Sequence, residues 1–246
     1  MDLGFWTAGV IAAILVGMGK GGLPVVGMMS VPVLALVMNP VAAAGLLLPV
    51  YVISDMFGLM AYRSKFDARV LKIVVPAACF GIALGWATAT VVPVWLVTLL
   101  VGLIGGVFAI YSLVRRPPEG PPREAKVAPG LFWGTICGFT SFVSHSGGPP
   151  WQVYVLPLRL DKLIFAGTGT IAFAIINAVK LIPYYFLGQL SFENMQYAAV
   201  LMVPASISVF IGVKLVKILP QKLFYQLVTY ALLLLSLKLI YDALTA

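Results

Sequence analysis

Charged residues are scarce in this sequence. Only 10% of its 246 residues are charged, whereas 61% are hydrophobic. A soluble domain carries about 25% charged residues, because water has to solvate its surface. Apolar runs of about 20 residues recur along the chain, and each is long enough to cross a hydrocarbon core of about 30 Å. The lack of charge excludes a soluble protein and predicts an all-α polytopic membrane protein.

Histidine and cysteine are also rare, with one and two residues respectively. Cys79 and Cys137 lie inside apolar runs, where cysteine behaves as a small hydrophobic residue, so we expect no disulfide. The sequence has no P-loop, which excludes ATP as an energy source. We expect no metal site and no bound cofactor.

Glycine motifs give no sign of a nucleotide site either. Gly17, Gly19 and Gly22 match the dinucleotide pattern G-x-G-x-x-G, but no strand precedes them and no acidic residue follows about 20 positions later. We therefore reject that interpretation. The glycine clusters at 81–85 and 102–106 fit helix-packing faces, because small residues let membrane helices approach closely.

The positive charge of the chain, formally +8, lies in short loops between apolar runs. This is the pattern of cytoplasmic loops in membrane proteins. It indicates how the chain is oriented, and it does not predict a nucleic-acid partner.

The apolar runs form two halves of similar layout, separated by a polar linker at 115–128. The first half, 1–114, is expected to hold a broken helical hairpin at 5–38 and transmembrane helices at 41–61, 70–91 and 94–114. The second half, 129–246, is expected to hold a hairpin at 129–158 and helices at 164–187, 194–213 and 221–244. Matching prolines and glycines recur at nearly constant separation in the two halves, which indicates an internal duplication.

The first run of each half is too long for one simple crossing. As a single helix, 5–38 would measure about 51 Å, and a glycine- and proline-rich break interrupts it at 17–24; a similar break lies at 144–150. If both runs are re-entrant hairpins, the lysines and arginines of the loops between the apolar runs all fall on one side of the membrane. If both runs cross fully, these residues divide between the two sides. The hairpins are favoured. They predict two inverted repeats, both termini outside the cytoplasm, and two hairpin tips that meet near the midplane.

Residues at these breaks predict an anion site. Non-helical backbone at membrane depth has to line a cavity or be buried in protein, and the N-termini of the returning arms attract anions. The expected substrate-binding residues are Lys20, Gly21, Gly22, Ser144, His145, Ser146, Gly147, Gly148, Gln152, Thr168, Thr170 and Asn177. Two alternatives stay open: Lys20 as a cation that stabilises the end of the entering arm, and His145 as a satisfied core residue.

Asp55 is the one acidic residue inside a predicted crossing. A carboxylate there is either a proton carrier that couples transport or the partner of Lys20, unless it reaches water at the cytoplasmic end of its helix. Under the inverted repeat its counterpart lies near Asn177. Lys180 and Lys238 lie toward the outer ends of their helices, where we expect them to snorkel to water.

Three features occur together in this chain: the glycine-rich break in the first run, the loop at Tyr62–Lys65, and the repeat after a polar linker. They resemble the TauE/SafE family of sulfite exporters and toluene-sulfonate uptake permeases. The resemblance implies transport of sulfite, thiosulfate, sulfoacetate or other organosulfonates across a bacterial inner membrane. One departure is that the family often has a Thr-Ser pair early in the second helix of each half, where this chain has Gly45–Leu47, although Thr168 and Thr170 remain in the second half.

The predicted function is therefore a secondary transporter in the lipid bilayer, not an enzyme, that moves a small sulfur-containing anion. An ion gradient, taken to be protons, would supply the energy. Two other functions stay open: a passive anion channel, and an intramembrane hydrolase that uses Ser146 with His145.

Overall fold

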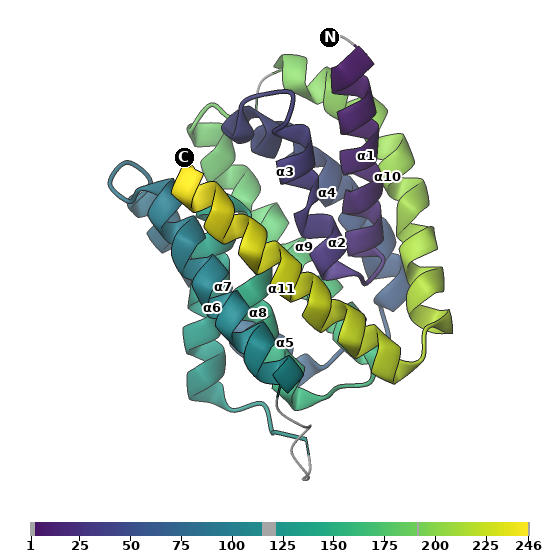
Figure 1. Ribbon diagram of the computed structural model, residues 1–246. Coiled ribbons are helices and arrows are strands. Elements are labelled where there is room, and N and C mark those ends of the chain that lie inside the picture. Colours follow the sequence, from purple (N-terminus) through teal and green to yellow (C-terminus); the bar gives the residue numbers. More distant parts are fainter. Residues whose placement is uncertain (1–2, 115–121, 191, 246) are drawn as a thin grey trace. The chain divides into compact units, whose positions relative to one another are not determined.

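The structure, a computed structural model, describes residues 3–114, 122–190 and 192–245 (Figure 1). It contains helices and no strand in these ranges, and eight of the helices are long and apolar enough to cross a membrane. The predicted all-α polytopic class is therefore confirmed. Residues 115–121, which form half of the predicted linker, lie outside the described residues.

The helices follow one another with short connections. They are α1 (Leu3–Lys20), α2 (Pro24–Met28), α3 (Ser30–Leu34), α4 (Pro40–Tyr62), α5 (Ala68–Ala87), α6 (Val94–Val114), α7 (Val127–Ser144), α8 (Gly148–Val155), the 3-10 helix η1 (Leu156–Leu158), α9 (Lys162–Phe186), α10 (Phe192–Ile218) and α11 (Gln221–Thr245).

The chain divides into two compact units, and each combines segments from both halves of the sequence. The first unit comprises Met1–Phe66 and Ala166–Leu219, and the second comprises Asp67–Phe165 and Pro220–Ala246. The first hairpin and most of α9 thus belong to one unit, and the second hairpin belongs to the other. The inverted relation between the sequence halves stays a prediction.

In the first unit the chain reverses at the first break. The N–H groups of Gly21 and Gly22 donate to the carbonyls of Gly17 and Gly19, which closes the last turn of α1. Gly22 has a φ of 105°, a conformation that favours glycine, and Pro24 then begins α2. Figure 1 shows α2 and α3 running back beside α1, and both contact it.

Small residues allow the arms of this hairpin to pack closely. A Cβ on Gly19 would lie 2.6 Å from the Cα of Gly27, so the two arms cross here backbone to backbone. The far side of α1 packs against α10 in the same way, because Gly17 faces the Ala205 backbone. Apolar side chains of α1, α3, α4 and α10, among them Leu201, complete the core of the unit.

In the second unit the chain reverses at the second break. His145 follows α7 with a φ of 53°, and α8 begins at Gly148. The Tyr154 hydroxyl near the end of α8 donates to the carbonyl of Lys126, just before the start of α7, at 3.0 Å. The end of the returning arm therefore lies beside the start of the entering arm, as a hairpin requires.

Glycines also line the helix contacts of the second unit. Gly81 and Gly85 of α5 face α7, and Gly102 and Gly105 of α6 face α11. The interpretation of these glycines as helix-packing positions is confirmed. A side chain at any of these four positions would collide with the facing helix.

Both predicted hairpins are thus present as reversals of the chain. Their entering arms, α1 and α7, have 18 residues each. At 1.5 Å per residue each arm measures about 27 Å, close to the thickness of a hydrocarbon core. The depth of the tips and the membrane face from which each hairpin enters stay predictions.

Candidate functional site

Three charged side chains are buried in the part of the chain that the structure describes. Lys20, Asp55 and Lys180 keep 7%, 2% and 1% of their surface exposed. All three belong to the first unit. Removing an ion from water costs several kcal/mol, and ionisable residues inside membrane helices mark sites of function by default. This cluster is therefore the first candidate for a functional site.

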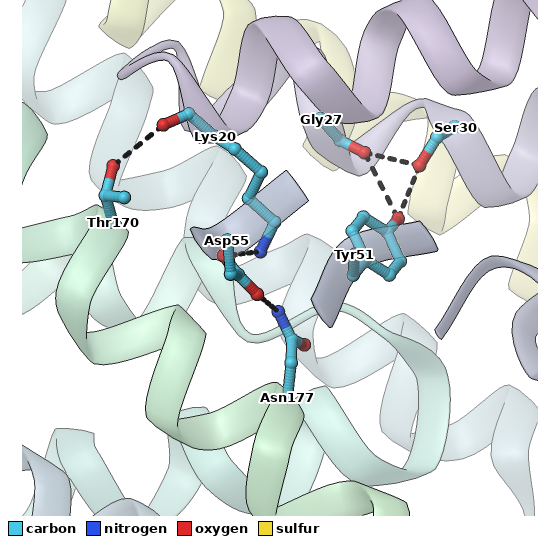
Figure 2. A network of polar contacts seen from close by, with 7 residues as sticks. All are labelled: Lys20, Gly27, Ser30, Tyr51, Asp55, Thr170 and Asn177. Atoms are coloured by element: carbon cyan, nitrogen blue, oxygen red, sulfur yellow. Dashed lines mark hydrogen bonds and ion pairs between the residues drawn. The ribbon is translucent and has the colours of Figure 1, made fainter. Parts of the chain in front are cut away.

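Lys20 and Asp55 form an ion pair, with 2.8 Å between Lys20 Nζ and Asp55 Oδ1. The side-chain amide of Asn177 donates to the other carboxylate oxygen, Oδ2, also at 2.8 Å. Figure 2 shows the carboxylate between the ammonium of α1 and the amide of α9. Asp55 is thus the partner of Lys20, one of the roles that the sequence left open, and it is also in contact with Asn177, near which the predicted repeat places its counterpart.

The first break places the Lys20 backbone against α4 and α9. The Thr170 hydroxyl donates to the Lys20 carbonyl at 3.1 Å, so α9 satisfies a carbonyl at the end of α1. Gly58 lies about one turn after Asp55, and a Cβ there would come within 2.9 Å of the same carbonyl. Lys20 also occupies the last turn of α1, where its charge stabilises the negative end of the helix dipole. Both interpretations of Lys20 are compatible with this geometry.

Tyr51 connects the returning arm of the first hairpin to the ion pair. Its hydroxyl and that of Ser30 are hydrogen-bonded, and the Ser30 hydroxyl donates to the Gly27 carbonyl at 2.6 Å. The Lys20 ammonium lies 5.0 Å from the centre of the Tyr51 ring, within the range of a cation–π interaction. The hairpin is thus held to α4 on both sides of its break (Figure 2).

Lys180 is buried, so the expectation that it snorkels to water is wrong. Its ammonium lies 5.6 Å from the centre of the Tyr184 ring. Asn177 precedes it by three residues and therefore shares its face of α9. The three-residue spacing from Asn177 is the sequence feature that could have indicated a buried position for Lys180. Lys238, by contrast, is exposed and forms an ion pair with Asp242 at 2.5 Å.

At the second break, hydroxyl groups of the loop and of the end of α7 form hydrogen bonds with carbonyls of the same segment. The Ser146 hydroxyl donates to the carbonyl of Ser144 at 3.0 Å, and the Ser144 hydroxyl donates to the carbonyl of Thr140 at 3.3 Å. Thr140 in turn donates to the carbonyl of Ser146. Gly147 lies against Cys137 and Ser141 of α7, where a Cβ would come within 2.8 Å of each residue. These hydroxyls hold the loop in shape, a role that the sequence did not indicate.

Gln152 is different, because its side chain is fully buried and neither its amide oxygen nor its amide nitrogen has a hydrogen-bond partner among the described residues. It lies on α8, one turn after Gly148. The first N–H groups of a helix have no intrahelical acceptor. A buried amide without partners costs about 1–3 kcal/mol, and a polar ligand would remove that cost.

The predicted site residues therefore fall into two groups. Lys20, Gly21, Gly22, Thr168, Thr170 and Asn177 lie in the first unit with Asp55, and Ser144, His145, Ser146, Gly147, Gly148 and Gln152 lie in the second. The prediction that both hairpin tips share one ligand stays a prediction. No group of three His, Cys, Asp or Glu side chains that could hold a metal ion occurs among the described residues.

Comparison with known proteins identifies the chain at the level of a family. The model of the family described as Sulfite exporter TauE/SafE matches residues 5–239. The chain belongs to the TauE/SafE family. No curated protein and no solved structure matches it.

Membership of the TauE/SafE family implies a membrane transporter of sulfur-containing anions, and the eight apolar helices agree with it. The match extends over both units, so it includes the buried ion pair of the first and the Gln152 amide of the second.

The stability of the first unit is predicted to depend more on Asp55 than on Lys20. Asp55→Asn leaves two buried ammonium groups without a carboxylate, and breaking a buried pair costs about 3–5 kcal/mol. Lys20→Met leaves Asp55 with Lys180, which interacts with it electrostatically, so the loss is expected to be smaller. The free energy of unfolding in mixed detergent measures both changes.

The exposed Lys238–Asp242 pair is the matched control, since Asp242→Asn should cost less than about 1 kcal/mol. The double variant Lys20→Met/Asp55→Asn is expected to be more stable than Asp55→Asn alone. Equal losses of unfolding free energy for Asp55→Asn and Asp242→Asn would contradict the prediction that the buried pair is important for stability.

Gln152→Met should stabilise the ligand-free protein, because it replaces an amide without partners by an apolar side chain of similar length. The expected gain is about 1–3 kcal/mol, measured as the free energy of unfolding. Gln226→Met, at an exposed position of α11 in the same unit, is the control and should change little. A loss of stability in Gln152→Met alone would show that the amide has a partner within the protein.

Proposed function

We propose that this chain is a secondary transporter that moves a sulfur oxyanion or an organosulfonate across the bacterial inner membrane. Sulfite, thiosulfate and sulfoacetate are the candidate substrates. The Lys20–Asp55 pair carries the proposal, because Lys20 is a buried cation whose counter-charge lies on a different helix. An entering anion competes with Asp55 for the Lys20 ammonium. Family membership supports the substrate class.

Proton coupling follows from this competition. Once an anion holds Lys20, the Asp55 carboxylate loses its closest counter-charge. In a low-dielectric site an ionised carboxylate without a counter-charge is less stable than its protonated form. Asp55 then takes up a proton. The groups that face it are Lys20 from α1, Asn177 and Lys180 from α9, and Tyr51 from its own helix. A proton and an anion are thus expected to bind together.

In the second unit we propose that Gln152 and the backbone at Gly147 and Gly148 donate to the oxygens of the anion. The buried amide of Gln152, which has no hydrogen-bond partner in the described part of the chain, supports this role. Ser144, His145 and Ser146 are proposed to shape the loop around these donors. Gly21 and Gly22 are proposed to let the anion approach Lys20, and Thr168 and Thr170 to provide polar lining.

Transport by purified protein in liposomes is the test of this function. Uptake of sulfoacetate, which keeps its sulfonate ionised, is expected to saturate and to increase when a proton gradient is imposed. Lys20→Met should abolish uptake, and Asp55→Asn should leave a downhill flux that no longer responds to pH. Lys238→Met is the control and should transport normally.

Two results would contradict the proposal. Uptake in Lys20→Met at the wild-type rate would remove Lys20 from the site. A flux in the wild type that never saturates and ignores the proton gradient would indicate a passive channel instead of a coupled transporter.

We also propose that both termini lie outside the cytoplasm, because the basic loop residues then share the cytoplasmic side. A reporter that is active only in the cytoplasm is expected to be inactive when fused to the C-terminus. The same reporter fused after Lys65, in the basic loop between α4 and α5, should be active. Activity at both positions would contradict this topology.

A further inference from the structure

Ser236 of α11 is a fully buried serine in the second unit, and its hydroxyl has no hydrogen-bond partner among the described residues. The other serines and threonines of α6 and α11 donate to the carbonyl four residues earlier in their own helix. These bonds, 2.8–2.9 Å long, are made by Thr98, Ser112, Thr229 and Thr245. Ser236 does not use the corresponding acceptor, so its hydroxyl is available to another group.

The hydroxyl of Ser236 points toward the contact between α6 and α8. A Cβ placed on Gly105 of α6 would lie 2.5 Å from Ser236 Oγ and 3.0 Å from the Cβ of Pro149 in α8. The serine hydroxyl and Pro149 are therefore neighbours of one point on α6. Because Gly105 has no side chain there, α11 and α8 can both approach α6 at this point.

Gln152 lies on the same side of α8 as Pro149. The opposite side is marked by Gly147 and Tyr154, which both lie against residues of α7. At about 100° per residue, Pro149 and Gln152 are each about 140–160° away from those two residues around the helix. Gln152 follows Pro149 by three residues and so shares its face. Its buried amide is thus directed away from α7, on the face of α8 that meets α6 beside Ser236.

Two buried polar side chains from different helices therefore lie on one side of α8, and neither has a hydrogen-bond partner in the part of the chain that the structure describes. A buried polar group without a partner lowers stability, and native proteins satisfy nearly all such groups. A hydroxyl and an amide nitrogen both donate hydrogen bonds, and both are uncharged. The pair fits a ligand that accepts from two directions.

We propose that Ser236 is a further substrate-binding residue, and that its hydroxyl and the Gln152 amide donate to two oxygens of the same sulfur anion. The inference rests on the proposed transport function and extends its site in the second unit to α11. A sulfonate has several acceptor oxygens, so different helices can each supply a donor. Because neither donor is charged, the pair distinguishes anions by where their oxygens lie.

Calorimetric titration of the purified protein with methanesulfonate and with thiosulfate tests this assignment. Ser236→Ala is expected to weaken binding of both by about 10- to 100-fold, as for the loss of one hydrogen bond to a charged group. Ser112→Ala is the matched control, because the Ser112 hydroxyl lies in the same unit and donates to the carbonyl of Phe108. This control should bind both anions as the wild type does.

Unfolding temperature separates a binding role from a structural one. Ligand-free Ser236→Ala should unfold at the same temperature as the wild type or higher, because no hydrogen bond within the protein is lost. A lower unfolding temperature together with unchanged affinity would overturn the proposal, and it would indicate that the hydroxyl stabilises the fold through a bound water.

The double variant Ser236→Ala/Gln152→Met tests whether both donors hold the same anion. Its loss of affinity is expected to be smaller than the product of the two single losses, because the first change already releases the anion from the position that the second donor requires. A loss equal to that product would contradict a shared anion.

Failures of the two proposals are distinguishable. Wild-type affinity for both anions in Ser236→Ala would overturn the role of Ser236 and leave those of Lys20 and Gln152 intact. Failure of the wild type to bind either anion would overturn the proposed function itself.

Discussion

The ion pair between Lys20 and Asp55 is the constraint on which the first unit depends. Two ions have left water here, and the cost is offset only because the ammonium lies 2.8 Å from the carboxylate and Asn177 donates to its second oxygen. Three helices, α1, α4 and α9, therefore have to meet at one point. A shift of any of them would leave a charge without its partner. The position of the first break follows from this requirement.

Glycine makes that meeting possible. Gly22 adopts a conformation that other residues avoid, Gly19 lets the returning arm cross α1, and Gly58 lets α4 approach the Lys20 carbonyl. Each glycine removes a side chain where two backbones or a backbone and a polar side chain come together. The apolar core of α1, α3, α4 and α10 then holds the hairpin in place. The same sequence feature, a glycine-rich break, thus serves the fold and the site at once.

Much of this arrangement could be predicted from the sequence, because membrane-spanning segments are recognised by their length and hydropathy. A buried lysine and a buried carboxylate in a chain with so few charges had to find partners, so Lys20 and Asp55 were natural candidates for a pair. The prediction that Lys180 reaches water is wrong, because a position toward the end of a helix allows snorkelling only on an exposed face, and Lys180 shares the buried face of Asn177. The hydrogen bonds of Ser144 and Ser146 to nearby carbonyls depend on loop geometry, which no pattern of residue types reveals. The combination of segments from both halves in each unit is equally invisible in a linear sequence.

The two breaks are not chemically equivalent, although the sequence gives them similar glycines and prolines. The first lies beside buried ions on α1, α4 and α9, whereas the second has a neutral amide, Gln152, and hydroxyls that its own loop uses. A charged cluster supplies most of the attraction for an anion but little directional selectivity, because Coulomb forces act at a distance. A buried amide supplies the reverse, since an oxygen must lie where the N–H points. If the anion is bound as we propose, the first break recognises charge and the second recognises shape, and selectivity among sulfur anions is then expected to depend on the second hairpin more than on the first.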